Sequence, residues 1–286
     1  MILIADSGST KTDWRLIDGQ GKVEQAKTTG FNPYQNNEEE IFIELDRSLK
    51  PVLSAKPDKI FYYGAGCKAR DKAALVTRAI QKAFPESEVV VDHDLLAAAR
   101  SLCGNEAGIA CILGTGSNSC LYDGHNIVEH RLSLAFILGD EGSGAVMGKM
   151  LVKKYLDEEL PAHLAEKFKK RYNPNPEEIL DFVYKKPFPN RYLSGFSQFL
   201  YHNMGDPFIY KMIYDSFSDF FDKTILRYTD YQKYPAHFVG SIAFYYSNIL
   251  RQVANDKGVV VKNILETPIA GLTLYHSKNF TMSDGQ

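Results

Sequence analysis

Residues 2–17 read ILIADSGSTKTDWRLI, and the fold is predicted from this stretch outward. An apolar run ends at Asp6, a turn of small polar residues follows, and Trp14 opens a second apolar run. A further turn at Asp18-Gly19 leads into residues 22–26. Short apolar runs separated by glycine-containing turns are typical of consecutive antiparallel strands, so this stretch predicts a three-stranded meander.

Helix and strand patterns alternate after the meander. Residues 36–49 place Ile41, Leu45 and Leu49 on one face of a helix. The later segments of this half are predicted as strands at 59–63 and 88–92 and helices at 70–84 and 94–102. The order of the half is therefore βββαβαβα.

The opening pattern returns later in the chain. Residues 109–113 are an apolar run, 114–119 are a turn of small residues, and 120–122 and 127–131 complete a second meander. Gly116 lies about a hundred positions after Gly8, which indicates a duplicated half, although two hairpins can also be alike by chance.

The second half carries an insertion. Residues 141–234 are mostly helical in pattern and are interrupted by prolines. Strands at 237–239 and 259–261 and helices at 243–253 and 269–276 then complete the half. We therefore expect an α/β protein of two similar domains. The expected boundaries are residues 1–104 and 105–268, with a helical insertion at about 150–234 and a C-terminal helix, about 269–286, that packs on the first domain.

The composition excludes several classes of protein. With 286 residues, 44% hydrophobic content and a net charge of −2, the chain is neither disordered nor a small disulfide scaffold. It has no bulk positive charge for nucleic acid or anionic membranes, no apolar run of the roughly 20 residues that cross a bilayer, and no signal sequence, so a cytoplasmic protein is expected. The four cysteines form no CxxC pair, so buried free thiols are expected instead of a metal cluster.

Each meander has a glycine-containing turn between its first two strands. Glycine lets a ligand approach the backbone, and successive N–H groups with Ser or Thr hydroxyls form an anion-binding concavity. One such turn is weak evidence, whereas a matching pair in two repeats predicts phosphate binding by both. No Walker A sequence is present. The candidate phosphate-binding residues are Gly8, Ser9, Thr10, Lys11, Thr12, Gly114, Thr115, Gly116 and Ser117.

Carboxylates lie at the ends of two predicted strands. Asp6, beside the first turn, is placed to hold Mg²⁺ through water, and its alternative is an Asx-turn. Asp92 and Asp94 follow a strand at the edge where active sites of α/β sheets gather. An aspartate there can act as general base for a hydroxyl, and the alternative is a helix N-cap.

Residues 139–144, GDEGSG, begin the helical block. Three glycines in six positions cost helix propensity, which indicates close approach of a ligand or of another backbone, and we favour a ligand. A competing motif is GAGCKA at residues 64–69, which fits a dinucleotide site with Asp92 as its acidic residue. However, this motif follows the fourth strand of its half, whereas a dinucleotide site follows the first strand of a βαβ unit.

With these residues assembled, the sequence resembles the sugar kinase, actin and heat-shock-chaperone superfamily of ribonuclease H-like ATPases. Within it, the sequence is most similar to the N-acetylglucosamine kinases of the benzoyl-CoA-reductase-type ATPase family. Residues 6–12 resemble the phosphate-1 loop, 113–119 the phosphate-2 loop and 237–241 the adenosine motif, and 139–143 are similar to a family-specific motif. The resemblance implies two ribonuclease H-like, actin-like ATPase domains with a nucleotide cleft between them, and ATP and Mg²⁺ as cofactors.

The resemblance also implies roles for individual residues. Asp94 corresponds to the catalytic base, and Asn32, Asp140 and Glu141 to substrate-contacting residues. Gly240 and Ser241 correspond to adenosine-binding residues, and Thr10 and Thr115 to residues that meet the nucleotide phosphates. Residues 132–136, LSLAF, stand where the family has a Gly- and Trp-containing stretch that lines the sugar site. The kinase assignment is therefore firmer than the choice of sugar.

The predicted activity is transfer of the γ-phosphoryl group of MgATP to an amino sugar, with the 6-hydroxyl of N-acetylglucosamine as the first candidate. The sequence is compatible with a homodimer and does not determine the oligomeric state. The alternative is an ATPase that activates a redox enzyme, as relatives with an iron–sulfur cluster between subunits do, and the scattered cysteines argue against it. A regulatory protein without turnover and a dinucleotide dehydrogenase are lesser alternatives.

Overall fold

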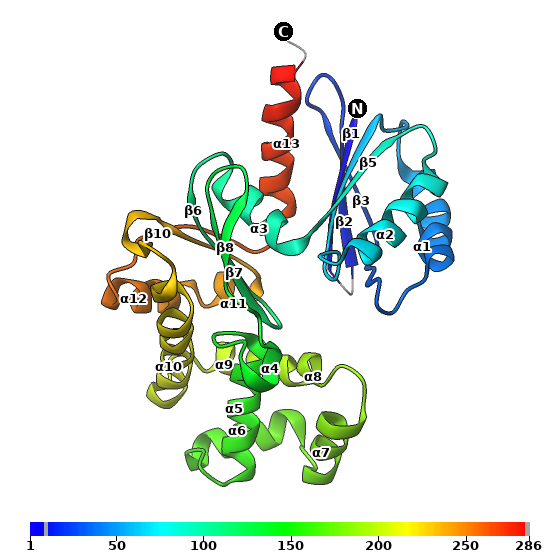
Figure 1. Ribbon diagram of the computed structural model, residues 1–286. Coiled ribbons are helices and arrows are strands. Elements are labelled where there is room, and N and C mark those ends of the chain that lie inside the picture. The colour runs from blue at the N-terminus through cyan, green and yellow to red at the C-terminus, as the bar shows by residue number, and fades with distance from the viewer. Residues whose placement is uncertain (9–10, 284–286) are drawn as a thin grey trace. The chain divides into compact units, whose positions relative to one another are not determined.

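The chain divides into two compact units, each built around one five-stranded sheet (Figure 1). The structure, a computed structural model, describes residues 1–8 and 11–283. Unit 1 comprises residues 1–106 and 123–127 and the chain from Thr267 onward. Unit 2 comprises residues 107–122 and 128–266.

The sheet of unit 1 is mixed. Its strand order is β3-β2-β1-β4-β5, in which β1 pairs antiparallel with β2 and parallel with β4. The strands are β1 (Ile2–Ser7), β2 (Lys11–Ile17), β3 (Val23–Thr29), β4 (Lys59–Gly64) and β5 (Glu88–His93). The helices are α1 (Glu38–Glu44), α2 (Arg70–Ala83), α3 (Asp94–Cys103) and α13 (Ile269–Ser283).

Helices cover both faces of this sheet. Leu3 and Ala5 point into a core shared with α1 and α2, whereas Ile2 and Ile4 point into a core shared with α3 and α13. A strand that is buried on both faces needs apolar residues at every position, which explains the unbroken run at the start of the chain.

The sheet of unit 2 repeats the first. Its order is β10-β9-β6-β7-β8, so β6 takes the place of β1, with one antiparallel neighbour, β7, and one parallel neighbour, β9. The duplicated ribonuclease H-like fold is thereby confirmed. The dinucleotide-binding alternative is wrong, because the strand ahead of residues 64–69 lies inside a mixed sheet of this order. The strands are β6 (Gly108–Leu113), β7 (Ser117–Tyr122), β8 (Ile127–His130), β9 (Ala236–Val239) and β10 (Val261–Leu265).

The insertion in unit 2 is helical, and prolines mark several of the breaks between its helices. Proline is the first residue of α7, α8 and α10, where its missing N–H costs no hydrogen bond. The helices are α4 (Ala135–Leu138), α5 (Gly144–Leu156), α6 (Ala162–Tyr172), α7 (Pro176–Lys185), α8 (Pro189–Gly195), α9 (Ser197–His202), α10 (Pro207–Lys223), α11 (Ser241–Tyr245) and α12 (Ser247–Asp256).

Two predicted helices differ in detail. The helix expected over 36–49 is α1 followed by a π-helical turn, Leu45–Leu49, and the one expected over 243–253 is divided between α11 and α12. Over residues 1–8 and 11–283, no helix has the length and apolar character to span a bilayer.

Candidate functional site

In unit 1, three acidic side chains gather at one edge of the sheet. β1, β4 and β5 are parallel, so their carboxyl ends share an edge, where β1 carries Asp6 and β5 leads directly into Asp94. Asp13 lies opposite Asp6 in the register of β1 with β2. Burial, and then the charges of Asp13 and Asp94, raise the pKa of Asp6 to about 7.

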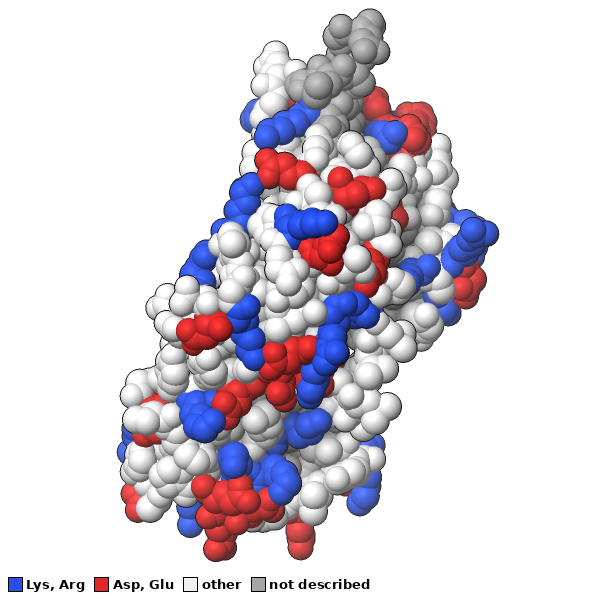
Figure 2. Space-filling model, turned by 60° about the vertical axis from the view of Figure 1, so that its left-hand side comes forward, with Lys and Arg blue, Asp and Glu red and all other residues white. Residues whose placement is uncertain are grey.

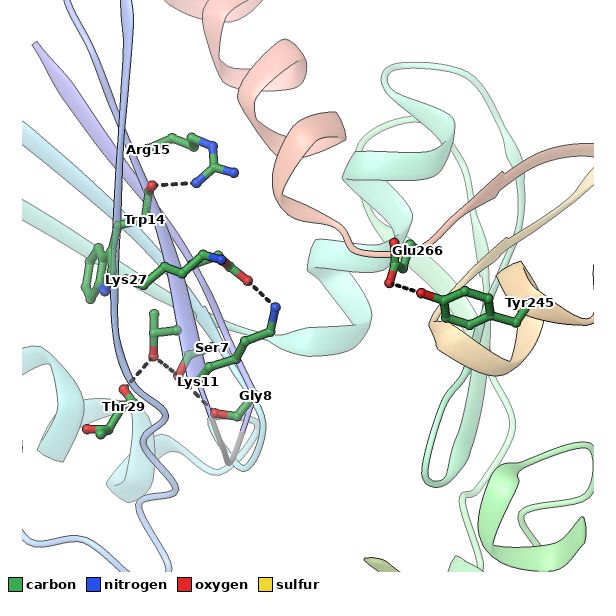
Figure 3. A network of polar contacts seen from close by, with 11 residues as sticks. Ser7, Gly8, Lys11, Trp14, Arg15, Lys27, Thr29, Tyr245 and Glu266 are labelled. Carbon is green, nitrogen blue, oxygen red and sulfur yellow. Dashed lines mark hydrogen bonds and ion pairs between the residues drawn. The ribbon is translucent and has the colours of Figure 1, made fainter. Parts of the chain in front are cut away.

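Two lysines offset part of this negative charge. Lys11 Nζ lies 3.0 Å from one carboxylate oxygen of Asp13, and Lys27 Nζ lies 3.9 Å from the other (Figure 3). Asp13 is buried whereas both lysines are largely exposed. The nearby Asp13 carboxylate raises the pKa of Asp6, and the charge of Lys11 opposes this effect.

The carboxylates at this edge fit a magnesium ion that is held mostly by water and substrate. Mg²⁺ prefers hard oxygen ligands, keeps several waters and needs only one or two carboxylates beside a phosphate. Among the described residues, no three acidic, His or Cys side chains converge closely enough to form a complete metal site. Asp6 fits the role because a cation would replace the proton that its raised pKa favours.

Asp94 is the first residue of α3. Its Oδ1 accepts a hydrogen bond of 2.9 Å from the N–H of Leu95, and burial raises its pKa despite His93 and Lys68 nearby. The N-cap is His93, whose Nδ1 accepts from the N–H of Leu96 at 3.3 Å. The alternative in which Asp92 or Asp94 serves as the N-cap is therefore wrong. A carboxylate of raised proton affinity at a strand end suits general-base chemistry.

The first turn is only partly described, because Ser9 and Thr10 lie outside the described residues. Gly8 is exposed, and its N–H donates to the carbonyl of Lys11 at 3.0 Å. Thr12 is fully buried, and its hydroxyl bonds to Ser7 Oγ at 2.7 Å and donates to the carbonyl of Thr29 (Figure 3). Thr12 therefore stabilises the turn, and we leave it out of the phosphate-binding set.

Asn32 lies in the loop between β3 and α1. Its Oδ1 accepts from the N–H of Tyr34 at 3.0 Å, and its own N–H donates to Asn36 Oδ1 at 3.0 Å. The side-chain oxygen is thus held by the loop. The Nδ2 group of this side chain is a second hydrogen-bonding group and can only donate.

In unit 2, a pocket of about 660 Å³ brings together residues that are far apart in sequence. Thr115, from the second turn, and Ser241, at the start of α11, line the same pocket. Tyr245 also lines it, and its hydroxyl donates to Glu266 Oε1 at 2.9 Å (Figure 3). Sequence reasoning missed Arg191 and Tyr201, which come from the insertion, and Tyr245 and Tyr246, which end and cap α11. The other lining residues are Arg191, Ser194, Gly195, Ser197, Gln198, Tyr201, His202, Ile242 and Tyr246.

Gly240 directly follows β9 and packs closely against Leu113, the last residue of β6. Its φ is 122°, and a Cβ there would lie 2.3 Å from the carbonyl oxygen of Leu113. Only glycine allows this approach of two strand ends. Protein packing therefore accounts for Gly240, and its neighbour Ser241 provides the pocket side chain.

The second turn supports the start of α5. The N–H of Gly144 donates to the carbonyl of Gly114 at 2.8 Å, and the N–H of Ala145 donates to that of Thr115 at 3.0 Å. A Cβ on Gly144 would also lie 2.4 Å from Ser194 Oγ. The close neighbours of Gly144 are therefore other parts of the protein, and not the ligand that its sequence context favours.

Asp140 lies beside Gly116 and Ser117 in unit 2. The N–H of Ser117 and the hydroxyl of Ser133 donate to its carboxylate, yet burial raises its pKa. A pocket of about 160 Å³ lies here, and Glu141 in its wall is paired with Lys223 at 3.0 Å. Sequence reasoning missed Lys223, because only the fold brings α10 to this pocket. The remaining lining residues are Asn118, Ser119, Arg131, Leu132, Leu134, Gly139, Phe220 and Thr224.

The surface charge is mixed. Figure 2 shows basic and acidic side chains interspersed over the face that it draws, in keeping with the net charge of −2. The candidate carboxylates of each unit therefore act locally, and not as part of a large field of one sign.

Two mixed sheets of matching strand order, each with a glycine-containing turn between its first two strands, define the actin-like ATPase class of fold. No family model and no curated protein matches the chain. Among solved structures, a protein from Porphyromonas gingivalis, provisionally described as an N-acetylglucosamine kinase, is 42% identical, with a TM-score of 0.92 over 98% of this chain and 100% of that one.

More distant structures support the fold. A second provisionally described N-acetylglucosamine kinase, from Chromobacterium violaceum, is 17% identical, with a TM-score of 0.74 over 96% of this chain and 98% of that one. A ROK hexokinase from Thermus thermophilus is 12% identical, with a TM-score of 0.52 over 96% and 97%.

The chain belongs to the N-acetylglucosamine kinase-like branch of the benzoyl-CoA-reductase-type ATPase family. The predicted enzyme class, a phosphotransferase with an alcohol group as acceptor, is confirmed by the relative of 42% identity, and the protein is a sugar kinase. The alternative of a redox-enzyme activator is not favoured. All four cysteines are buried and none forms a disulfide bond, with Cys67 and Cys103 in unit 1 and Cys111 and Cys120 in unit 2.

Proposed function

We propose that this sugar kinase transfers the γ-phosphoryl group of MgATP to an N-acetylated amino sugar, with the 6-hydroxyl of N-acetylglucosamine as the acceptor. The observation that carries the proposal is Asp94, a carboxylate with a raised pKa at the edge of the sheet where Asp6 also lies. The 42% identity to a protein described as such a kinase supports the choice of sugar.

Candidate residues of both units would have a part in the reaction. Asp94 would accept the proton of the sugar hydroxyl while Asn32 Nδ2 donates to the sugar. In unit 2, Thr115, the N–H group of Gly116 and the hydroxyl of Ser117 would bind phosphate oxygens, and the pocket behind Ser241 would take the adenosine. Asp140, held by Ser117 and Ser133, would accept hydrogen bonds from sugar hydroxyls.

The chemical step is an in-line displacement. The sugar oxygen forms a bond to the γ-phosphorus, the bond from that phosphorus to the β-phosphate oxygen breaks, the hydroxyl proton passes to Asp94, and ADP leaves. Bound magnesium supplies charge neutralisation on the phosphates, and Asp6 would hold it through water. Because such transition states need positioning and charge stabilisation more than covalent help, the rigid strand ends are suitable supports.

The test is substitution of the proposed base. Asp94→Asn keeps the shape of the side chain and an oxygen for the N–H of Leu95, but it removes the proton acceptor. We expect kcat with ATP and N-acetylglucosamine to fall by about 10²- to 10⁴-fold with little change in the KM of either substrate. The matched control is Asp46→Asn, because Asp46 is exposed and pairs only with Lys50 among the described residues.

Two outcomes would contradict the proposal. A correctly folded Asp94→Asn variant with near-wild-type turnover would remove Asp94 as the base. A panel of N-acetylglucosamine, glucosamine, N-acetylmannosamine, N-acetylmuramate and glucose that yields no sugar-dependent ADP would remove the amino-sugar assignment.

A further inference from the structure

Unit 1 contains a buried polar network that the proposed reaction does not use. It consists of Tyr63 on β4, Arg100 on α3 and His276 on α13. Arg100 Nη1 donates to the Tyr63 hydroxyl at 2.7 Å, and this hydroxyl lies 2.9 Å from His276 Nε2. The imidazole also stacks on Phe61, with ring centroids 3.9 Å apart. Three elements that are distant in sequence are therefore joined through one phenol oxygen.

The hydrogen bonds in this network have a defined direction. Burial, and then the charges of Arg100 and Lys59, lower the pKa of His276 to about 3, so the ring is neutral. A guanidinium has only donors, so the Tyr63 oxygen accepts from Arg100. The single phenol hydrogen is then available for His276 Nε2, which accepts it in the neutral tautomer that carries its hydrogen on Nδ1. The two hydrogen bonds through the Tyr63 oxygen therefore have one arrangement, which restricts the three elements that they join. Among the described residues, Arg100 Nε is buried without a hydrogen-bond partner, so the network depends on Nη1.

The network connects to the proposed base through α3. Arg100 Nη1 also lies 3.8 Å from Asp92 Oδ2 at the end of β5, two residues before Asp94. Asp94 is the first residue of the helix that carries Arg100. The apolar contacts beside the network join the same elements, since Ala97 of α3 and Leu272 of α13 share a core with Tyr63. The position of Asp94 thus depends on the placement of α3 against β4, β5 and α13.

We propose that the Arg100–Tyr63–His276 network positions helix α3, and through it the Asp94 carboxylate, for phosphoryl transfer. The inference rests on the base role of Asp94 in the proposed function. Tyr63, Arg100 and His276 are positioning residues, and Asp92 belongs with them through its ion pair to Arg100. The C-terminal helix is then part of the support for the catalytic base, and not only a cover for the sheet.

The first test is Tyr63→Phe, which removes one oxygen and keeps the ring. We expect kcat to fall about tenfold while the KM for ATP and for the sugar changes less than about twofold, because a displaced base slows the step without weakening binding. The matched control is Tyr214→Phe on α10 of unit 2. Tyr214 also loses a hydroxyl hydrogen bond, of 2.8 Å to Asp256, but it lies outside the network.

The second test keeps or removes the acceptor at position 276. His276→Gln can place an amide oxygen near the position of Nε2, whereas His276→Leu cannot. We expect the Gln variant to retain several-fold more turnover than the Leu variant. Hydrogen exchange of the amides of residues 94–99 is measured in parallel. It should accelerate in Tyr63→Phe and His276→Leu and remain unchanged in Tyr214→Phe.

The inference is overturned if Tyr63→Phe keeps both its turnover and the slow exchange of α3, or if the Gln and Leu variants at position 276 lose turnover equally. If Tyr63→Phe does not fold, the comparison of the two His276 variants decides. If the wild-type protein phosphorylates no sugar, the proposed function fails, and the exchange measurements decide separately whether the network holds α3.

Discussion

Asp6→Asn should make the stability of unit 1 less dependent on pH. The folded-state pKa of Asp6, about 7, lies above its ordinary value of 3.8, because burial and the charges of Asp13 and Asp94 disfavour its ionised form. The folded protein therefore retains a proton that the unfolded chain releases. This contribution to stability is fully present below pH 3.8 and is lost progressively as the pH rises to about 7.

The magnitude follows from the size of the shift. About three pKa units at roughly 1.4 kcal/mol each give a ceiling near 4 kcal/mol for the cost of ionising Asp6 in the folded state. Water at this partly exposed carboxylate reduces the cost. The variant lacks the ionisable group. We therefore expect the free energy of unfolding of the wild type, relative to that of the variant, to fall by about 2 kcal/mol between pH 5 and pH 8.

Trp14 provides the assay. It is the one tryptophan in the chain and is fully buried on β2, so its fluorescence reports the unfolding of unit 1. Urea titrations at pH 5, 6, 7 and 8 without magnesium give the free energy of unfolding for wild type, Asp6→Asn and the exposed control Asp46→Asn. Parallel profiles for wild type and Asp6→Asn would refute this account of Asp6. Magnesium at pH 8 should stabilise the wild type and not Asp6→Asn, because a bound cation replaces the missing proton.

Two further substitutions test unit 2. Asp140→Asn should raise the KM for the sugar about 10- to 100-fold and leave the KM for ATP unchanged, because a charged hydrogen-bond acceptor is lost. The backbone should be unaffected, since Asn tolerates the φ of 58° at this position. An unchanged KM for the sugar would contradict the proposed role of Asp140. Gly240→Ala should destabilise unit 2 by about 3 kcal/mol or more, measured by circular dichroism in urea, because its Cβ would meet the carbonyl oxygen of Leu113 at 2.3 Å. The control is Gly205→Ala, where a Cβ meets open space, and equal stability of the two variants would disprove the packing role of Gly240.

The duplicated fold could be predicted because its signals are local. Each meander is written in apolar runs and glycine-containing turns, and both central strands are buried on two faces, so their residues are apolar at successive positions. Asp6 and Asp94 could be found because strand ends are visible in the sequence and parallel strands share a carboxyl edge. The N-cap of α3 was mistaken, because histidine is a less common cap than aspartate and only the structure shows that Nδ1 of His93 takes the role.

The sequence by itself determined the repeat, the class of fold and the acidic residues at the strand ends, because these depend on neighbouring residues and on periodicity. Tertiary structure decided which side chains meet. It buries Thr12, forms an ion pair between Glu141 and Lys223, and forms a hydrogen bond between His276 and Tyr63, which are far apart in the sequence. It also raised the pKa of Asp6 by burying it beside Asp13 and Asp94. Burial and long-range proximity are properties of the packed chain, and no local pattern encodes them.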